Sequence, residues 1–258
     1  MGGVFRELLD GVLSLLFPPR CEVCGLLQEP VVCDRCLAHF QRVTEPYCRQ
    51  CGLPFDPLAK AATHCPDCRE DPPPFDAARA AGRYGGALRR AIHLFKYDGV
   101  RAMAGPLGQF TLETVELPFP IDCLCPVPLH PKREAMRGFN QSRLLADALG
   151  AGWGTPVEAG MLERVQNTPP QMSLPAGERR QNIRGAFTVT GNAAGRAIGL
   201  VDDVFTTGST LRECSLMLKR AGAARVLVIS VARTAPSIWN DDGPVSQRPE
   251  GTMPPSGG

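Results

Sequence analysis

Long hydrophobic runs are missing from this chain of 258 residues. Its longest unbroken apolar stretch is far too short to cross a bilayer, so no stable membrane insertion is expected. Residues 4–17 have the pattern of an amphipathic helix, and we place an N-terminal helix at 1–20. Glu7 and Asp10 interrupt its apolar pattern, and no small-residue cleavage site precedes Cys21, which argues against a signal peptide. We therefore expect a cytoplasmic protein.

Charge of one sign and nucleotide-binding signatures are also scarce. The formal net charge is only +2, so it gives no argument for nucleic-acid binding. The sequence lacks a GxxxxGK segment followed by Ser or Thr, which excludes a P-loop nucleotide site. Any phosphate site in this chain must therefore be built differently.

Cysteine, by contrast, is abundant and regularly spaced. Two thiolates separated by two residues can chelate one tetrahedral ion, and two such pairs complete a four-cysteine site. The four CxxC pairs therefore predict two structural zinc ions. Pairing in chain order is simplest, although interleaved pairing also satisfies the spacing. Disulfides conflict with the missing secretion signal, whereas an iron–sulfur cluster remains an alternative. The eight predicted ligands are Cys21, Cys24, Cys33, Cys36, Cys48, Cys51, Cys65 and Cys68.

The composition of the chain suggests where its domains begin and end. Residues 70–76, EDPPPFD, read as a stiff proline linker. They separate a zinc module at 21–70 from a larger domain at 76–234. From residue 235 the chain is rich in Pro, Gly and Ser, and we expect a disordered tail at 235–258.

One segment, Arg196 to Ala221, carries the strongest functional signal. Its apolar run 197–201 is typical of a buried strand in a parallel sheet, and the adjacent acids Asp202 and Asp203 follow directly. A hydroxyl-rich loop then precedes a helical pattern, and the start of a helix favours a phosphate. Adjacent carboxylates suit vicinal hydroxyls or magnesium. The segment predicts a sugar phosphate ligand with magnesium. The loop residues are Thr206, Thr207, Gly208, Ser209 and Thr210.

Two further segments are rich in cations. A short predicted strand at 121–125 runs into a proline-rigid loop that ends in Lys132 and Arg133, which suggests a second anion site. Residues 163–185 contain four arginines and no persistent apolar period. Such a segment is typical of a lid over an anionic ligand, or of a solvated basic surface.

These motifs resemble known families. Residues 201–210 resemble the phosphoribosyl pyrophosphate motif of type I phosphoribosyltransferases. The four cysteine pairs precede PVPLHPKR, RGFNQS, ERVQNTPPQ, ERRQNIRGAF and VDDVFTTGST, and in this order they resemble the ComF family from residue 21 to about 234. The resemblance implies an α/β fold. It combines a type I phosphoribosyltransferase-like parallel sheet flanked by helices with an N-terminal double zinc-ribbon module.

The resemblance also implies roles for individual residues. Asp202 and Asp203 would hold the ribose hydroxyls, residues 206–210 the 5-phosphate, and Lys96, Lys132 and Arg133 the pyrophosphate. Residues 164–185 would form a flexible hood. The implied activity transfers a phosphoribosyl group from phosphoribosyl pyrophosphate, with magnesium, to an acceptor that no residue identifies. No catalytic base is apparent.

Family members in transformable bacteria are linked to DNA uptake and competence, and three functions stay open. The first is a phosphoribosyltransferase. The second is a sensor that binds phosphoribosyl pyrophosphate without turnover. The third is a zinc-ribbon adaptor that docks single-stranded DNA or a DNA-uptake helicase. Residues 21–68 show no dense cluster of basic and aromatic side chains, which favours docking of a protein partner over direct DNA contact.

Overall fold

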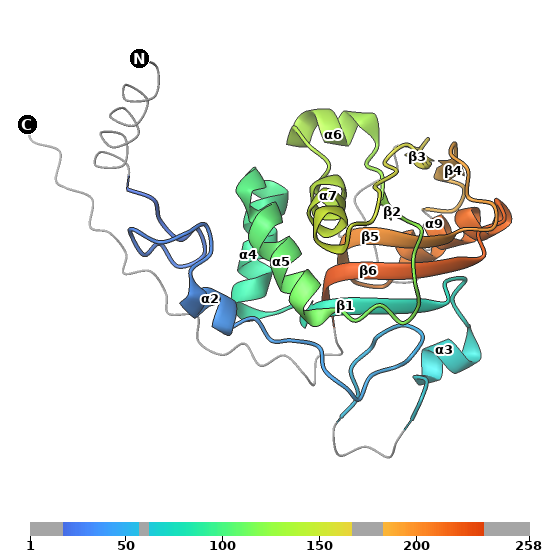
Figure 1. The fold of residues 1–258 in the computed structure, drawn as a ribbon, viewed down its shortest axis with the longest axis horizontal. Helices are drawn as coiled ribbons and strands as arrows, with labels where there is room; N and C mark the ends of the chain where they lie inside the picture. Colours follow the sequence, from blue (N-terminus) through green and yellow to red (C-terminus); the bar gives the residue numbers. More distant parts are fainter. Residues whose placement is uncertain (1–17, 57–61, 167–182, 235–258) are drawn as a thin grey trace, which may run out of the picture.

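A parallel β-sheet forms the centre of the protein (Figure 1). The computed structural model describes residues 18–56, 62–166 and 183–234. Within them the sheet has four strands in the order β1-β6-β5-β2. Its strands are β1 (Ala77–Arg83), β2 (Cys123–Pro126), β5 (Ala197–Phe205) and β6 (Arg225–Arg233). The predicted parallel α/β sheet is confirmed, with β1 as an edge strand.

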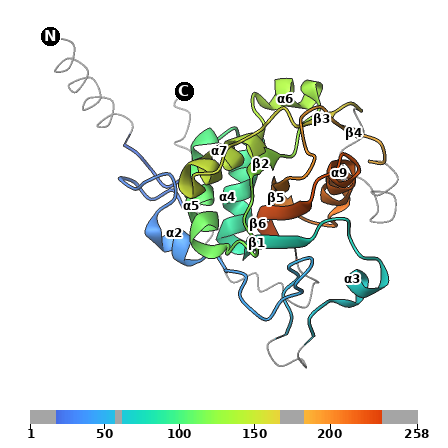
Figure 2. The same cartoon turned by 45° about the vertical axis from the view of Figure 1, so that its right-hand side comes forward.

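Helices cover both faces of this sheet. On one face lie α4 (Gly86–Tyr97), α5 (Ala104–Thr114) and α7 (Gln141–Trp153), and on the other lies α9 (Ser209–Arg220) (Figures 1 and 2). Alternate residues of β6 enter two different cores: Leu227 and Ile229 face the three helices, whereas Val226 and Val228 face α9. Burial on both faces explains why the central strands read as continuous apolar runs.

The region after β2 differs from the expected rigid loop ending in Lys132 and Arg133, because both residues lie in a helix. It contains two helices, α6 (Pro131–Arg137) and α7. Pro131 suits the first turn of α6, and Gly138 ends that helix with a φ of 81°. Asn140 then caps α7. The short 3-10 helix η1 (Arg101–Met103) directly precedes α5.

A small second sheet lies apart from the main one. Strands β3 (Leu162–Arg164) and β4 (Phe187–Val189) pair antiparallel and do not join the central sheet. Most of the predicted hood lies between these strands, and its residues 167–182 fall outside the described part of the chain. The predicted helix at 1–20, apart from residues 18–20, and the predicted tail at 235–258 also fall outside it.

The cysteine-rich segment runs along two different sides of the α/β core. It contains two short helices, α2 (Asp34–Ala38) and α3 (Pro66–Glu70). In both views α2 lies beside α4, whereas α3 lies beyond the β1 edge (Figures 1 and 2). The first cysteine set shares the core of α4, α5 and α7, and the second set shares the core of α9. Among the described residues, no helix has the length and hydrophobicity needed to cross a membrane.

Candidate functional site

A cleft of about 1100 Å³ opens at the carboxyl ends of β2 and β5. This edge of an open parallel sheet is where ligands usually bind. The cleft brings together residues from α4, α6, β5 and the start of α9. Of the ten side chains predicted to contact the ligand, nine line it: Lys96, Lys132, Arg133, Asp202, Asp203, Thr206, Gly208, Ser209 and Thr210. Thr207 is not among the lining residues, and its hydroxyl lies 3.0 Å from that of Ser209.

The acid pair lies within strand β5 instead of following it. We placed the end of this strand at Val201, but β6 continues to pair with it as far as Phe205. Asp202 lies opposite Ser230 in this register, so the ladder holds the backbone of the acid pair. The carboxylates are therefore carried on the most rigid part of the fold, not on a mobile turn.

Asp203 has a charged and a neutral partner. Its Oδ1 atom lies 2.8 Å from Nζ of Lys96, the second-last residue of α4. Its Oδ2 atom accepts a 3.0 Å hydrogen bond from Nε2 of Gln141. Only 3% of Asp203 is exposed. Burial is the largest single effect on Lys96 and opposes its charge, but the combined attraction of Asp203 and Asp202, with the hydrogen bond to Asp203, raises the pKa of the lysine.

Asp202 is held by neutral donors. Its Oδ1 atom accepts hydrogen bonds from Ser142 Oγ at 3.0 Å and from the backbone N–H of Asp203 at 2.9 Å. Burial, followed by repulsion from the charge on Asp203, raises the pKa of Asp202 to about 7. The two neighbouring acids therefore lie in different environments, and the raised pKa leaves Asp202 partly protonated near neutral pH.

The first turn of α7 supplies two site residues, Gln141 and Ser142, to which the sequence alone assigned no role. Asn140 orients this turn, because its Oδ1 atom accepts from the N–H of Ser142 at 2.9 Å while its Nδ2 atom donates to the carbonyl of Val127 at 3.1 Å. Gln141 and Ser142 are both buried. A sequence signal existed: two polar residues directly after an N-cap asparagine, at the start of an otherwise apolar helix.

The loop after β5 has the geometry of an anion site. Gly208 is the N-cap of α9 and has a φ of 73°. A glycine carries no side chain that could cap the first amides of the helix, so these N–H groups are not satisfied by their own N-cap. Thr206, Ser209 and Thr210 add hydroxyl groups around the same point of the cleft. Backbone amides, hydroxyls and the positive end of the helix dipole all favour a phosphate there.

Cations line the cleft beside this loop. Lys132 and Arg133 extend from the start of α6, where Nδ1 of His130 accepts from the N–H of Lys132 at 3.3 Å. Arg164 of β3 lines the same cleft and is 8% exposed. Burial, and then the charge of Arg133, lowers the pKa of Arg164. Several positive charges held together in this way can accept a polyphosphate. Of the two hood arginines within the described residues, Arg164 and Arg184, Arg164 lines the cleft.

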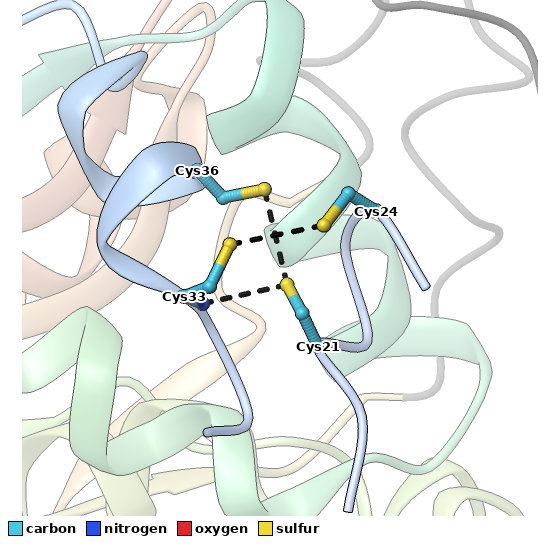
Figure 3. Close-up of side chains that lie close together, drawn as sticks. All are labelled: Cys21, Cys24, Cys33 and Cys36. Carbon is cyan, nitrogen blue, oxygen red and sulfur yellow. Dashed lines mark hydrogen bonds between the residues drawn. The ribbon is translucent and has the colours of Figure 1, made fainter. Parts of the chain in front are cut away.

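The first four cysteines form one set that fits a tetrahedral metal ion. Their side chains converge on a common point (Figure 3). The sulfurs of Cys21 and Cys36 lie 3.8 Å apart, and those of Cys24 and Cys33 lie 3.7 Å apart. A tetrahedron with Zn–S bonds of about 2.3 Å has edges of about 3.8 Å, so the spacing suits zinc. Gly25, directly after the second cysteine, has the expected positive φ, 81°.

The last four cysteines form a second set with the same geometry, so the pairing follows chain order. All four ligand atoms lie within 4.8 Å of one another, and the sulfurs of Cys51 and Cys65 are 3.7 Å apart. The N–H of Cys65 donates to the sulfur of Cys48 at 3.3 Å. A hydrogen bond from Cys51 lowers the pKa of Cys48 to about 4, as suits a thiolate ligand. The remaining cysteines, Cys123, Cys125 and Cys214, are buried core residues.

Fold and site together define a class of protein: a parallel α/β domain with an acid pair beside an anion loop, carrying two four-cysteine sites of the zinc-ribbon type. Residues 12–72 match the model of the double zinc ribbon domain. The chain is 34% identical over 231 residues to the DNA utilization protein YhgH of Salmonella typhi, covering 85% of this chain and 99% of that protein. It is 33% identical over 198 residues to competence protein F of Haemophilus influenzae, covering 73% of this chain and 85% of that protein.

The chain therefore belongs to the ComF family. A more distant relative is competence protein ComFC of Streptococcus pneumoniae, 27% identical over 235 residues, with 83% of this chain and all of that protein covered. Among solved structures, 49% of the chain is similar to 25% of the glutamine phosphoribosylpyrophosphate amidotransferase of B. subtilis, with 26% identity and a TM-score of 0.35. In addition, 57% of the chain is similar to 78% of a purine phosphoribosyltransferase from Pyrococcus horikoshii, with 18% identity and a TM-score of 0.28.

Proposed function

We propose that this protein binds phosphoribosyl pyrophosphate with magnesium and transfers its phosphoribosyl group to an acceptor. One observation carries the proposal: the acid pair lies near the carboxyl end of β5, the anion loop directly follows that strand, and both face the same cleft beside Lys132 and Arg133. A phosphate in the loop would leave the attached ribose over Asp202 and Asp203. The pyrophosphate would then lie toward the cationic side of the cleft.

The proposed chemistry is a substitution at C1 of the ribose. The bond from C1 to the pyrophosphate oxygen breaks, and its electron pair leaves with pyrophosphate. A lone pair of the acceptor forms the new bond to C1, and the acceptor loses a proton to solvent. Positive charge develops on the ribose in an oxocarbenium-like transition state, as in glycoside cleavage. Bound magnesium would neutralise charge on the leaving group.

The residues of this chain would contribute position and charge. Asp203, held by Lys96 and Gln141, has a fixed orientation and can accept a ribose hydroxyl without moving. Asp202, held by Ser142, can accept a second hydroxyl when ionised. The preference of the cleft for pyrophosphate over neutral groups comes from Lys132, Arg133 and Arg164.

Calorimetry with and without magnesium tests the proposal. Wild-type protein should bind phosphoribosyl pyrophosphate, and the double variant Asp202→Asn, Asp203→Asn should lose that binding. Asp147→Asn provides the matched control, because Asp147 pairs with Arg143 on the exposed side of α7. Pyrophosphate release should follow when nitrogen nucleophiles such as bases and amines are supplied. If the wild-type protein never saturates with phosphoribosyl pyrophosphate, the proposal is wrong.

A second candidate function is a sensor that binds the same ligand without turnover. The described residues that line the cleft include no histidine, and no carboxylate besides the acid pair, so no dedicated base faces the ligand there. Saturable binding with no pyrophosphate released across the panel of nucleophiles would select the sensor over the transferase.

The printed names of the relatives favour a role in DNA utilization or competence, and we infer such a role for this chain. One way to fulfil this role is direct DNA contact through the zinc module, and this is the less well supported of two possibilities. Arg42 is already bound to Glu113 at 3.2 Å and stacks on Phe110, so it is not available to a phosphate backbone. Docking of a DNA-uptake helicase is the better supported one, and co-purification of such a helicase with the full chain would test it.

A further inference from the structure

Arg233, the last residue of β6, connects the second cysteine set to the strand that carries the acid pair. It is only 7% exposed. Its Nη2 atom lies 3.4 Å from the sulfur of Cys51, and its guanidinium carbon lies 3.9 Å from the ring centroid of Phe205. A cation at that distance over an aromatic ring is a favourable contact when desolvated. One side chain therefore contacts both a proposed zinc ligand and the end of β5.

Phe205 in turn supports the anion loop. A Cβ atom built on Gly208 would overlap the ring of Phe205, so the loop backbone rests directly against this ring. Phe75, which follows the second cysteine set in the chain, packs its ring edge to face against Phe205 at 6.0 Å. A displacement of the Phe205 ring toward the loop would therefore push on the backbone at Gly208.

A second contact links the same two parts of the molecule. Arg212, in the first turn of α9, donates from Nη2 to Oδ2 of Asp71 at 2.6 Å and to the carbonyl of Asp71 at 2.7 Å. Asp71 directly follows α3, which contains Cys68. The helix that begins at the anion loop is thus fastened to the segment that ends the second cysteine set.

The charge of Arg233 makes this link sensitive to metal. A divalent ion with four thiolates carries two net negative charges, and hydrogen bonds from surrounding residues usually tune such sites. Within the described residues, Nε and Nη1 of Arg233 are buried without a hydrogen-bond partner. The buried positive charge of Arg233 is therefore stabilised mainly by the cysteine sulfurs and by the ring of Phe205. Loss of the metal would release the four sulfurs from their fixed arrangement, so the sulfur of Cys51 would no longer be held against Arg233.

We propose that Arg233 is a positioning residue that couples metal occupancy of the Cys48 to Cys68 site to the shape of the anion loop, through Phe205. The inference rests on the proposed function for the identity of the loop's ligand. It assigns no such role to the first cysteine set, because that set belongs to the core on the opposite face of the sheet. Zinc bound by the second cysteine set, but not zinc bound by the first, would then tighten binding of a phosphate ester at the loop.

The test uses the full-length, zinc-loaded protein and its variants Arg233→Met, Arg233→Lys and Arg225→Met. Arg225 is the matched control, because it lies at the other end of β6 and its guanidinium also stacks on a phenylalanine, Phe119, at 4.9 Å. Alkylation by N-ethylmaleimide, read by peptide mass spectrometry, reports metal loss from each cysteine set separately. Hydrogen exchange of the peptide covering 204–211 reports the loop. Alkylation of the buried thiol of Cys214 reports global unfolding.

We expect Arg233→Met to speed alkylation of the second set about 10- to 100-fold, the usual cost of losing a partner of a metal ligand, and to leave the first set within about twofold. Exchange in 204–211 should rise, with Cys214 still protected. Arg233→Lys, which keeps the charge, should show alkylation and exchange rates between those of the wild type and Arg233→Met. Arg225→Met should match the wild type. Equal effects of Arg233→Met and Arg225→Met, or no effect of either, would overturn the coupling.

Binding measurements with phosphoribosyl pyrophosphate separate this inference from the proposed function. Wild-type protein that never binds phosphoribosyl pyrophosphate refutes the proposed function, while alkylation and exchange still decide the coupling. If the wild type does bind it, coupling is reciprocal, so saturating ligand should slow alkylation of the second set and not of the first. Binding by Arg233→Met as tight as by the wild type would overturn the coupling to the ligand.

Discussion

Lys96 Nζ lies 2.8 Å from Oδ1 of Asp203, and the two side chains are only 20% and 5% exposed. This contact joins the end of α4 to the strand that carries the acid pair. It gives the two neighbouring acids different environments, because Asp203 has the lysine as its direct partner whereas Asp202 accepts from the neutral hydroxyl of Ser142. The difference predicts losses of stability of unequal size when each acid is neutralised.

We expect Asp203→Asn to lower the free energy of unfolding by about 3 kcal/mol, because it leaves the buried charge of Lys96 without its partner. Asp202→Asn should cost much less at pH 8, since it removes a buried charge that repels Asp203. Urea denaturation of both variants measures the difference. Adding Lys96→Met to Asp203→Asn should recover most of the loss. Equal losses in the two single variants would contradict this account of the pair.

The raised pKa of Asp202, about 7, predicts an unusual pH dependence of stability. Between its ordinary pKa of 3.8 and about 7, the native state holds a proton that the unfolded state has released. The free energy of unfolding contributed by this group therefore falls as pH rises through that window and levels off above it. The slope should approach 1.4 kcal/mol per pH unit. Denaturation at pH 5, 6, 7 and 8 should show this slope in the wild type relative to Asp202→Asn, and no difference in slope would refute it.

Local pattern in the sequence was enough to predict the parts of the site that lie in one continuous segment. The strand, acid pair, glycine loop and helix all occur between Arg196 and Ala221, and the cysteine sets are defined by their own spacing. Each of these features depends on residues a few positions apart. For that reason the sheet, the two four-cysteine sets and most of the cleft could be predicted.

What the sequence could not predict depends on contacts between distant segments. Gln141 and Ser142 reach the acids across 62 and 60 positions, and Arg233 reaches Cys51 across 182. Nothing near Arg233 marks it, because an arginine after an apolar strand usually reads as a solvated strand end. The expected end of β5 at Val201 was also too early, because pairing with β6 extends it through polar residues.

Loss of metal should have different consequences at the two cysteine sets. Cys24 is exposed, and its set lies against α4 and α5, so Cys24→Ser should weaken zinc binding and loosen that face of the core. Cys48→Ser should additionally destabilise the core beneath α9, to which Cys48 belongs. Zinc content by mass spectrometry should fall from two ions to about one in each variant. Thermal unfolding should show a larger loss for Cys48→Ser, and the reverse order would contradict the packing argument.

Two glycines with the same backbone conformation provide a direct test of the anion loop. Gly208 and Gly195 have φ angles of 73° and 71°, so alanine at either position costs about 1–2 kcal/mol for the left-handed backbone alone. At Gly195 the added Cβ meets nothing within 4 Å, whereas at Gly208 it would overlap the ring of Phe205. Gly208→Ala must therefore also displace either the ring or the loop.

We accordingly expect Gly195→Ala to lower stability by the backbone cost and to leave ligand binding unchanged. Gly208→Ala should lower stability further and weaken binding of phosphoribosyl pyrophosphate at least tenfold, because the amides at the start of α9 no longer point at one place. Urea denaturation and calorimetry on both variants measure the two effects. If Gly208→Ala binds the ligand as tightly as Gly195→Ala does, the loop does not hold the phosphate, and the ligand must be gripped elsewhere in the cleft.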